Sequence, residues 1–133
     1  MKDLTTTDIS DIISVVDPGK GGLTIAKPFE NEIFLFDTYI AGTSFIPGLE
    51  DLIEHLKINE KLDFFREPDN KHDKEAIVIK TNNKIKLGYV PRSDNVIFAR
   101  LMDAGKYLFG RIVEINTNHG SWIKITIKVF LKE

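Results

Sequence analysis

The sequence has 133 residues and a mass of 15.1 kDa, which is enough for one ordinary domain and too little for two. Its hydrophobic content of 42% supports a buried core and excludes a disordered chain. The sequence has no cysteine, which excludes a disulfide framework, a thiolate zinc site and a cysteine nucleophile. No apolar run is long enough to span a membrane, and residues 1–10 lack the pattern of a signal peptide, so we expect a cytoplasmic protein.

Charge is divided unevenly along the chain. The net charge is −2 and the sequence pI is about 5.9, which alone argues against a nucleic-acid partner. Residues 84–133, however, carry nine Lys/Arg and four Asp/Glu, a net of +5, whereas residues 1–83 carry nine and sixteen, a net of −7. This asymmetry is a reason to look for a basic face in the folded protein.

Residues 1–32 are predicted to form an N-terminal helix and an arm, and residues 33–133 the globular domain. Ile9, Ile12, Ile13 and Val16 follow the spacing of one helix face, and Pro18-Gly19 ends that pattern. In the domain, the apolar segment Ile33–Gly42 is predicted to be a buried strand. The remaining predicted strands are Lys61–Arg66, Glu75–Lys80, Lys84–Val90, Tyr107–Ile115 and Trp122–Leu131.

Two helices separate these strands. The first is expected over about residues 48–56, and the second begins near Pro91 with Ser93 as its N-cap, packs through Ile97 and ends at Gly105. Tight turns are expected at Asn82-Asn83 and over residues 117–120. The order predicts a mostly β fold with two to three short helices, arranged as an OB-like six-stranded curled sheet or a small barrel.

The last predicted strand presents two different faces. Alternate residues from Ile123 to Leu131 are apolar and are expected to face the core, whereas the other face carries Trp122, Lys124 and Lys128. An aromatic ring beside lysines on an exposed sheet face can stack on a base while the ammonium groups meet phosphates. The alternative is that Trp122 packs under a loop and the lysines protect an outer strand.

A second group with binding chemistry is formed by Tyr39, Tyr89 and Arg92. Arg92 stands at the predicted start of a helix, where backbone N–H groups and a guanidinium both attract phosphate. The alternative is two half-buried tyrosines and a solvated arginine.

Residues 67–73 form the most polar stretch, Glu-Pro-Asp-Asn-Lys-His-Asp. Carboxylates and a histidine are metal-ligand types, but their spacing matches no metal motif, and Asp and Asn also cap turns. The sequence contains neither a phosphate-binding loop nor a nucleophile–base signature. We therefore expect no cofactor and no enzymatic activity.

Three segments together resemble the HIRAN domain family. They are residues 37–44 (DTYIAGTS), 66–77 (REPDNKHDKEAI) and 87–92 (LGYVPR), and the resemblance covers about Phe34 to Leu131. It implies a modified OB-like barrel of about six strands with two helices. The family occurs as a module of DNA-remodelling helicases and as small bacterial proteins, and its characterised eukaryotic members hold the free 3′ end of single-stranded DNA.

The resemblance also implies roles for individual residues. Tyr39 and Trp122 correspond to base-stacking positions, and Tyr89 and Arg92 to phosphate or sugar contacts. Asp69, Asn70 and Asp73 correspond to the pocket that meets the terminal sugar and its hydroxyl. His72 stands where the family commonly has an aromatic residue, after Lys71 in place of proline, and Thr38 where DNA-binding members can carry a basic residue.

We therefore expect a non-catalytic module that binds single-stranded DNA, preferably at free 3′ ends, in DNA repair. A helicase or another DNA-processing protein is the expected second partner, and no membrane is involved. The alternatives are a protein-interaction or regulatory module that has lost DNA binding, or a metal-dependent nucleic-acid hydrolase using residues of the 67–73 stretch. The predicted DNA-binding residues are Tyr39, Asp69, Asn70, His72, Asp73, Tyr89, Arg92, Trp122 and Lys124.

Overall fold

The fold is built on one curled antiparallel sheet. The computed structural model describes residues 31–119 and 122–133, and the helix and arm predicted within residues 1–32 lie outside the described residues except at Asn31 and Glu32. The strands are β2 (Glu32–Tyr39), β3 (Lys61–Arg66), β4 (Ile77–Lys80), β5 (Lys86–Tyr89), β6 (Tyr107–His119) and β7 (Trp122–Lys132). The helical elements are η2 (Thr43–Phe45), α1 (Leu49–Leu52), η3 (Ile53–His55) and α2 (Arg92–Asp103).

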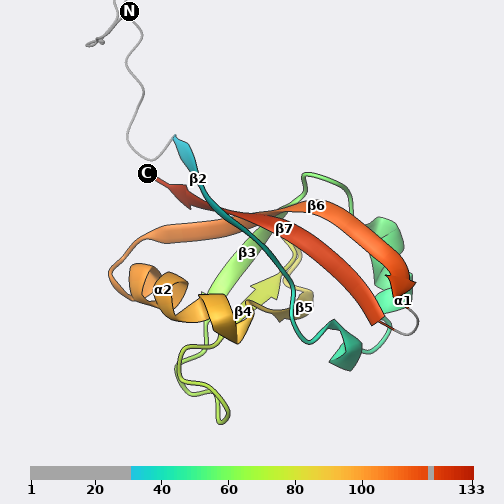
Figure 1. The fold of residues 1–133 in the computed structure, drawn as a ribbon, viewed down its shortest axis with the longest axis horizontal. Coiled ribbons are helices and arrows are strands. Elements are labelled where there is room, and N and C mark those ends of the chain that lie inside the picture. Colours follow the sequence, from blue (N-terminus) through green and yellow to red (C-terminus); the bar gives the residue numbers. More distant parts are fainter. Residues whose placement is uncertain (1–30, 120–121) are drawn as a thin grey trace, which may run out of the picture. The chain divides into compact units, whose positions relative to one another are not determined.

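The strands follow one another in the order β2-β7-β6-β3-β4-β5, and every neighbouring pair is antiparallel. The long β6–β7 hairpin arches across the molecule, and the β3–β4 connection extends away from the sheet (Figure 1). The curl brings the two outermost strands together beyond the end of β2. There the Ala41 N–H donates to Tyr89 O (2.7 Å) and the Tyr89 N–H donates to Ala41 O (2.9 Å). The result is a half-barrel of OB-like form with two α-helices, which confirms the predicted fold class.

The core fills the inside of the half-barrel. Ile125, Ile127 and Val129 of β7 are fully buried, while Trp122 and Lys128 of the same strand are exposed. The predicted alternation of β7 is therefore confirmed. Phe98 and Ala99 of α2 are buried in the same cluster, so this helix covers one part of the sheet.

Strand β2 differs from its prediction as a buried strand. It stands at one end of the strand order, and Ile33, Phe34 and Phe36 are all exposed. A register shift between Phe34 and Phe36 marks a bulge in its pairing with β7. The prediction of a buried strand is wrong because apolar composition alone does not distinguish a strand covered on both faces from one at the sheet edge.

Helix α2 is rotated relative to the predicted packing. Its Ile97 is 69% exposed, and the buried stripe is Asn95, Phe98 and Ala99, with Met102 packed against the core. These four positions also follow i, i+3, i+4 and i+7 spacing, but the stripe was not recognised in the sequence because Asn95 is polar.

The predicted N-cap of α2 is also wrong, since Pro91 occupies that position and no side chain caps the helix. Gly105 ends the helix as predicted, with φ 92° and the paired N–H bonds of residues 105 and 106 to Met102 O and Leu101 O.

Three smaller predictions also need correction. The helix expected over residues 48–56 is the short α1 followed by the 3₁₀ turn η3. Strand β6 continues to His119, so most of the expected 117–120 loop is strand. The turn after β4 forms where expected, closed by the Lys84 N–H donating to Thr81 O (2.9 Å), but its positive φ belongs to Lys84 and not to either asparagine.

Candidate nucleic-acid interface

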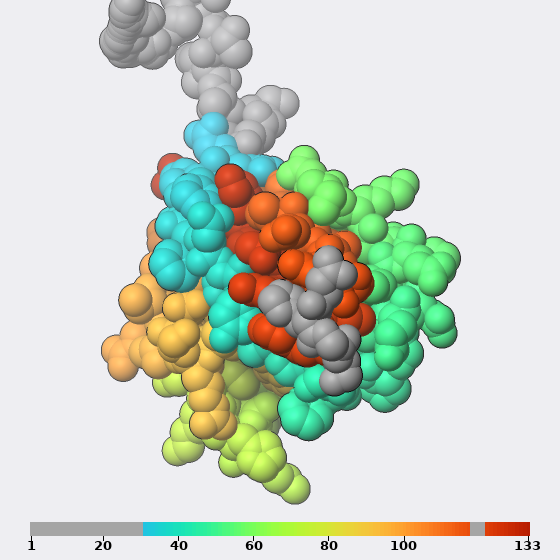
Figure 2. Space-filling model, turned by 45° about the vertical axis from the view of Figure 1, so that its right-hand side comes forward, coloured from blue at the N-terminus to red at the C-terminus, as the bar shows by residue number. Residues whose placement is uncertain are grey.

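A pocket of about 400 Å³ lies where three chain segments meet. The first segment follows β2, the second is the loop between β3 and β4, and the third runs from β5 into α2. Figure 2 shows the loop (yellow-green) beside α2 (amber) on the molecular surface. The pocket is lined by Ala41, Gly42, Phe45, Asn70, His72, Asp73, Ala76, Tyr89, Val90, Arg92 and Asn95.

Asn70 organises the loop between β3 and β4. Its side-chain Oδ1 accepts hydrogen bonds from the N–H groups of His72 (2.8 Å) and Asp73 (3.1 Å). Its Nδ2 donates to Glu67 Oε1 (3.1 Å). These are the short-range side-chain bonds by which Asn stabilises turns, and they place His72 and Asp73 at the pocket.

The base of the same loop is fastened by Arg66. Its guanidinium donates to Ala76 O (2.8 Å) and Lys74 O (3.0 Å), and its Nε donates to Asp103 Oδ1 at the end of α2 (2.9 Å). The hydrogen bond to Asp103 raises the pKa of Arg66 above its ordinary value. Arg66 therefore attaches the end of the loop both to β3, which carries Arg66, and to the end of α2.

Tyr89 is connected to the loop through Glu67. The Tyr89 hydroxyl donates to Glu67 Oε1 (2.8 Å) and accepts a bond from Lys86 Nζ (3.1 Å). Partial burial acts to raise the pKa of Glu67, but the hydrogen bonds from Asn70 and Tyr89, with the positive charge of Lys86, outweigh it and leave that pKa below its ordinary value. This network holds the Tyr89 ring in place at the pocket wall.

Asp73 supplies a carboxylate to the pocket. Its Oδ1 accepts a bond from the Glu75 N–H (2.9 Å), and its Oδ2 accepts one from Asn95 Nδ2 (2.7 Å). The bond from Glu75, followed by that from Asn95 and the charge of Arg92, lowers the pKa of Asp73 below its ordinary value. Asp73 is therefore ionised at neutral pH, and it also ties its own loop to α2.

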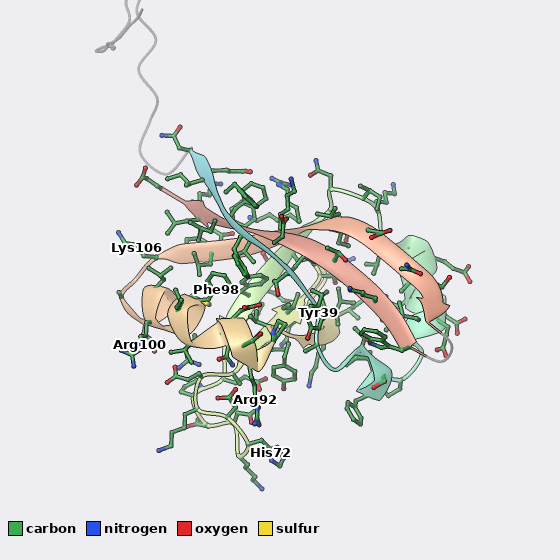
Figure 3. All side chains as sticks on the ribbon, in the orientation of Figure 1. Tyr39, His72, Arg92, Phe98, Arg100 and Lys106 are labelled. Atoms are coloured by element: carbon green, nitrogen blue, oxygen red, sulfur yellow. The ribbon has the colours of Figure 1, made fainter. Side chains whose placement is uncertain are left out.

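Arg92 stands at the first turn of α2 with a side chain that is 71% exposed. Its Nη2 donates to His72 O (2.9 Å), and its Nε lies 3.7 Å from Asp73 Oδ2. Figure 3 shows Arg92 and His72 together at the loop, with Tyr39 separate from them on β2. The guanidinium retains donors that face solvent, which suits it to an anionic ligand.

The structure brings together Asn70, His72, Asp73, Tyr89 and Arg92 at the pocket. Asp69 is exposed on the same turn but does not line it. Tyr39, Trp122 and Lys124 lie on the outer face of the sheet. Lys124 Nζ is 5.8 Å from the Tyr39 ring centroid, so these two form one aromatic and cationic pair near the end of β2.

Thr38 makes a hydrogen bond inside the protein. Its side chain is buried and its hydroxyl donates to Asp94 Oδ2 on α2 (2.7 Å). Because Thr38 is buried and bonded to Asp94, this position contributes no positive charge to the surface of this chain.

Among the lining residues that the sequence did not indicate, two have side chains able to bind a ligand or to position one. Asn95 is buried on the packed face of α2, and Phe45 lines the pocket from the turn η2. The polar residue within the α2 stripe was a signal for Asn95. Nothing in the pattern around Phe45 indicated its position, because it belongs to neither a strand nor a periodic helix.

The 67–73 stretch contains the His, Asp and Glu side chains that a metal-dependent hydrolase would need. Within residues 31–119 and 122–133, no group of three or more His, Asp or Glu side chains is arranged to hold a metal ion. In the same part of the chain, no helix has the length and apolar character needed to cross a membrane.

The HIRAN domain model matches residues 33–133. This chain belongs to the HIRAN domain family. The HIRAN fold is also found in a crystal structure of a protein from Lactobacillus plantarum, with 23% identity, a TM-score of 0.71, and coverage of 77% of this chain and 97% of that one. The HIRAN domain of human HLTF is 19% identical, with a TM-score of 0.57 and coverage of 77% of this chain and 81% of that one. A search of curated proteins gave no match.

Proposed function

We propose that this HIRAN protein is a non-catalytic binding module for single-stranded DNA and that its pocket receives a free 3′ end. The observation that carries the proposal is the joint placement of an ionised carboxylate, an exposed guanidinium and an aromatic ring around one pocket of about 400 Å³. This volume lies within the range of about 300–1,000 Å³ typical of small-ligand sites. The carboxylate of Asp73, the guanidinium of Arg92 and the ring of Tyr89 match the terminal hydroxyl, the phosphate and the sugar of a nucleotide.

Asp73 is the proposed acceptor for the terminal 3′-hydroxyl. An ionised carboxylate accepts hydrogen bonds only, so it can pair with a hydroxyl and repels a phosphate. Oδ2 already accepts one bond from Asn95 and retains a further lone pair. A strand that continued beyond the sugar would place a phosphate against this carboxylate, which provides discrimination against internal positions.

Arg92 is the proposed contact for the phosphate on the 5′ side of the terminal sugar. Its bond to His72 O leaves other N–H groups for a phosphate oxygen. Tyr39 and Lys124, which lie outside the pocket, are proposed to stack on the preceding base and to meet its phosphate. Trp122 is proposed to stack on a base still farther along the strand.

A second candidate function is protein binding through another part of the surface. An apolar groove of about 260 Å³ lies between β2 and α2, lined by Leu35, Phe36, Ser93, Asp94, Ile97, Phe98 and Leu101. Exposed apolar side chains beside a groove are typical of protein–protein contacts. This function, including contact with a DNA-processing protein, is compatible with an occupied DNA pocket.

The proposed function is tested with labelled oligonucleotides that carry a 3′-hydroxyl, a 3′-phosphate, or no end because they are circular. Fluorescence anisotropy should show tightest binding to the 3′-hydroxyl strand. Asp73→Asn should reduce the preference for hydroxyl over phosphate, and Asp69→Asn is the matched control because its carboxylate lies on the same turn outside the pocket. Equal affinity of the native protein for all three strands would exclude the proposal.

A further inference from the structure

Phe45 is the most exposed large apolar side chain in the described part of the chain. It is 84% exposed, and it still contributes to the lining of the pocket. Scattered exposed apolar residues are normal on protein surfaces. What distinguishes Phe45 is that its ring lines a pocket that also contains the charged side chains of Asp73 and Arg92.

The backbone that carries Phe45 is held in one conformation. The Phe45 N–H donates to Gly42 O (3.1 Å), and the next residue donates from its N–H to Thr43 O (3.1 Å). Thr43 is buried, and its hydroxyl donates to Ile123 O on β7 (2.7 Å). The turn η2 is thus fixed to the sheet, so binding a ligand against Phe45 requires little ordering of the protein.

The rest of the pocket supplies what a nucleotide needs besides its base. The carboxylate of Asp73 and the guanidinium of Arg92 address the sugar and phosphate, and Ala41, Ala76 and Val90 provide apolar surface. A phenylalanine ring has no hydrogen-bonding group, so it stacks on any base without selecting one.

We infer that Phe45 stacks on the base of the 3′-terminal nucleotide and makes end recognition dependent on the presence of a base but tolerant of its identity. This inference rests on the proposed function, because it assigns the Phe45 side of the same pocket. Phe45 lies outside the three segments that carry the family resemblance, residues 37–44, 66–77 and 87–92.

The test compares two oligonucleotides that differ only at the 3′-terminal residue. One has a normal base there, and the other has an abasic sugar that keeps the 3′-hydroxyl. The native protein should bind the first about 5- to 150-fold more tightly, the range expected for one stacked base. Phe45→Ala should bind both strands equally, and Phe45→Trp should restore the preference.

Ile58→Ala is the matched control, because Ile58 is 61% exposed and does not line the pocket. Both alanine variants should keep the native melting temperature, since each removes an exposed side chain. If the native protein binds 3′-hydroxyl ends but Phe45→Ala retains the native preference for the base, the inference is wrong and the proposed function stands. If the native protein binds none of the oligonucleotides, both are wrong.

Discussion

The side-chain amide of Asn95 donates a 2.7 Å hydrogen bond to Asp73 Oδ2, joining the buried face of α2 to the loop between β3 and β4. Asn95 is only 2% exposed, so the hydrogen-bond partner of its side-chain amide is a protein group and not solvent. The same bond orients the carboxylate that we propose to meet a 3′-hydroxyl. One contact therefore serves the packing of the helix and the shape of the pocket.

Removing this amide should destabilise the fold. Asn95→Ala removes the donor to Asp73 Oδ2 and leaves only the Glu75 N–H bond to Oδ1, so we expect the free energy of unfolding to fall by about 1–3 kcal/mol. Urea denaturation measures the change. Ser93→Ala, an exposed position on the same helix, is the control and should remain close to the native value. A native-like Asn95→Ala would show that the bond contributes nothing to stability.

Stability should depend on pH through Asp73 and Glu67. The pKa of each is below its ordinary value in the folded protein, so each stabilises the fold above its unfolded pKa, about 3.9 for Asp and 4.3 for Glu. This contribution is lost as pH falls through the folded pKa. We expect a melting temperature that varies little between about pH 7 and pH 5 and falls below about pH 4.

Asp73→Asn should show a smaller loss on acidification and a lower melting temperature at pH 7. The reason is that the variant lacks the charge whose stabilising contribution is lost in acid. Thermal melts across the pH series provide the measurement. An unchanged acid slope in Asp73→Asn would mean that this carboxylate is not one of the groups responsible.

DNA binding should weaken as salt rises. Contacts to about three phosphates predict a log–log slope near −2, from roughly 0.7 per phosphate on a single strand. Lys124→Gln should make the slope less steep by about 0.7 if its ammonium meets a phosphate. Lys57→Gln, an exposed position that does not line the pocket, should leave the slope unchanged. A flat salt dependence of the native protein would favour the protein-binding alternative.

Trp122 should affect only longer strands. It is exposed on β7 and does not line the pocket, so Trp122→Ala should weaken binding of a long oligonucleotide by about 1–3 kcal/mol and leave that of a dinucleotide unchanged. Parallel anisotropy titrations of the two ligands measure this. A large loss of melting temperature would instead identify the ring as part of the packed structure.

The sequence was sufficient for the strand order along the chain because period-two alternation and turn residues are local properties. The alternation of β7 was read correctly for this reason, and so was the end of α2 at Gly105. The exposure of β2 could not be obtained in the same way. The apolar residues of β2 are a property of its local sequence. Its position at the end of the sheet depends instead on pairing with β7, more than 80 residues away.

The pocket was predicted in part for a related reason. Asn70, His72 and Asp73 lie in one polar loop that is evident in the sequence. Tyr89 and Arg92 were indicated by their residue types and by the predicted helix start, and the family resemblance implied that they contact phosphate or sugar. Phe45 reaches the same place only because Thr43 bonds to β7 and Ala41 bonds to β5. Such a meeting of three segments depends on tertiary hydrogen bonds that leave no periodic signal.

Gly88 permits the contact that closes the half-barrel. A Cβ added there would lie 2.4 Å from Ala41 O and 2.6 Å from Ile40 Cγ2, so Gly88→Ala must displace the Ala41–Tyr89 pairing. We expect a loss of at least about 1–3 kcal/mol in the free energy of unfolding, as for other overpacked positions. Because Ala41 and Tyr89 also line the pocket, oligonucleotide affinity should fall as well.

Gly105→Ala separates this steric effect from backbone strain. Gly105 has a positive φ of 92°, but an added Cβ there meets no atom within 4 Å. Backbone strain alone should therefore lower the free energy of unfolding of this variant, by about 1–2 kcal/mol. Once folded, the variant should bind oligonucleotides like the native protein. Urea denaturation and anisotropy titration of both variants make the comparison. A Gly88→Ala variant with native stability and native affinity would show that closure at Ala41 is not required for the fold or the pocket.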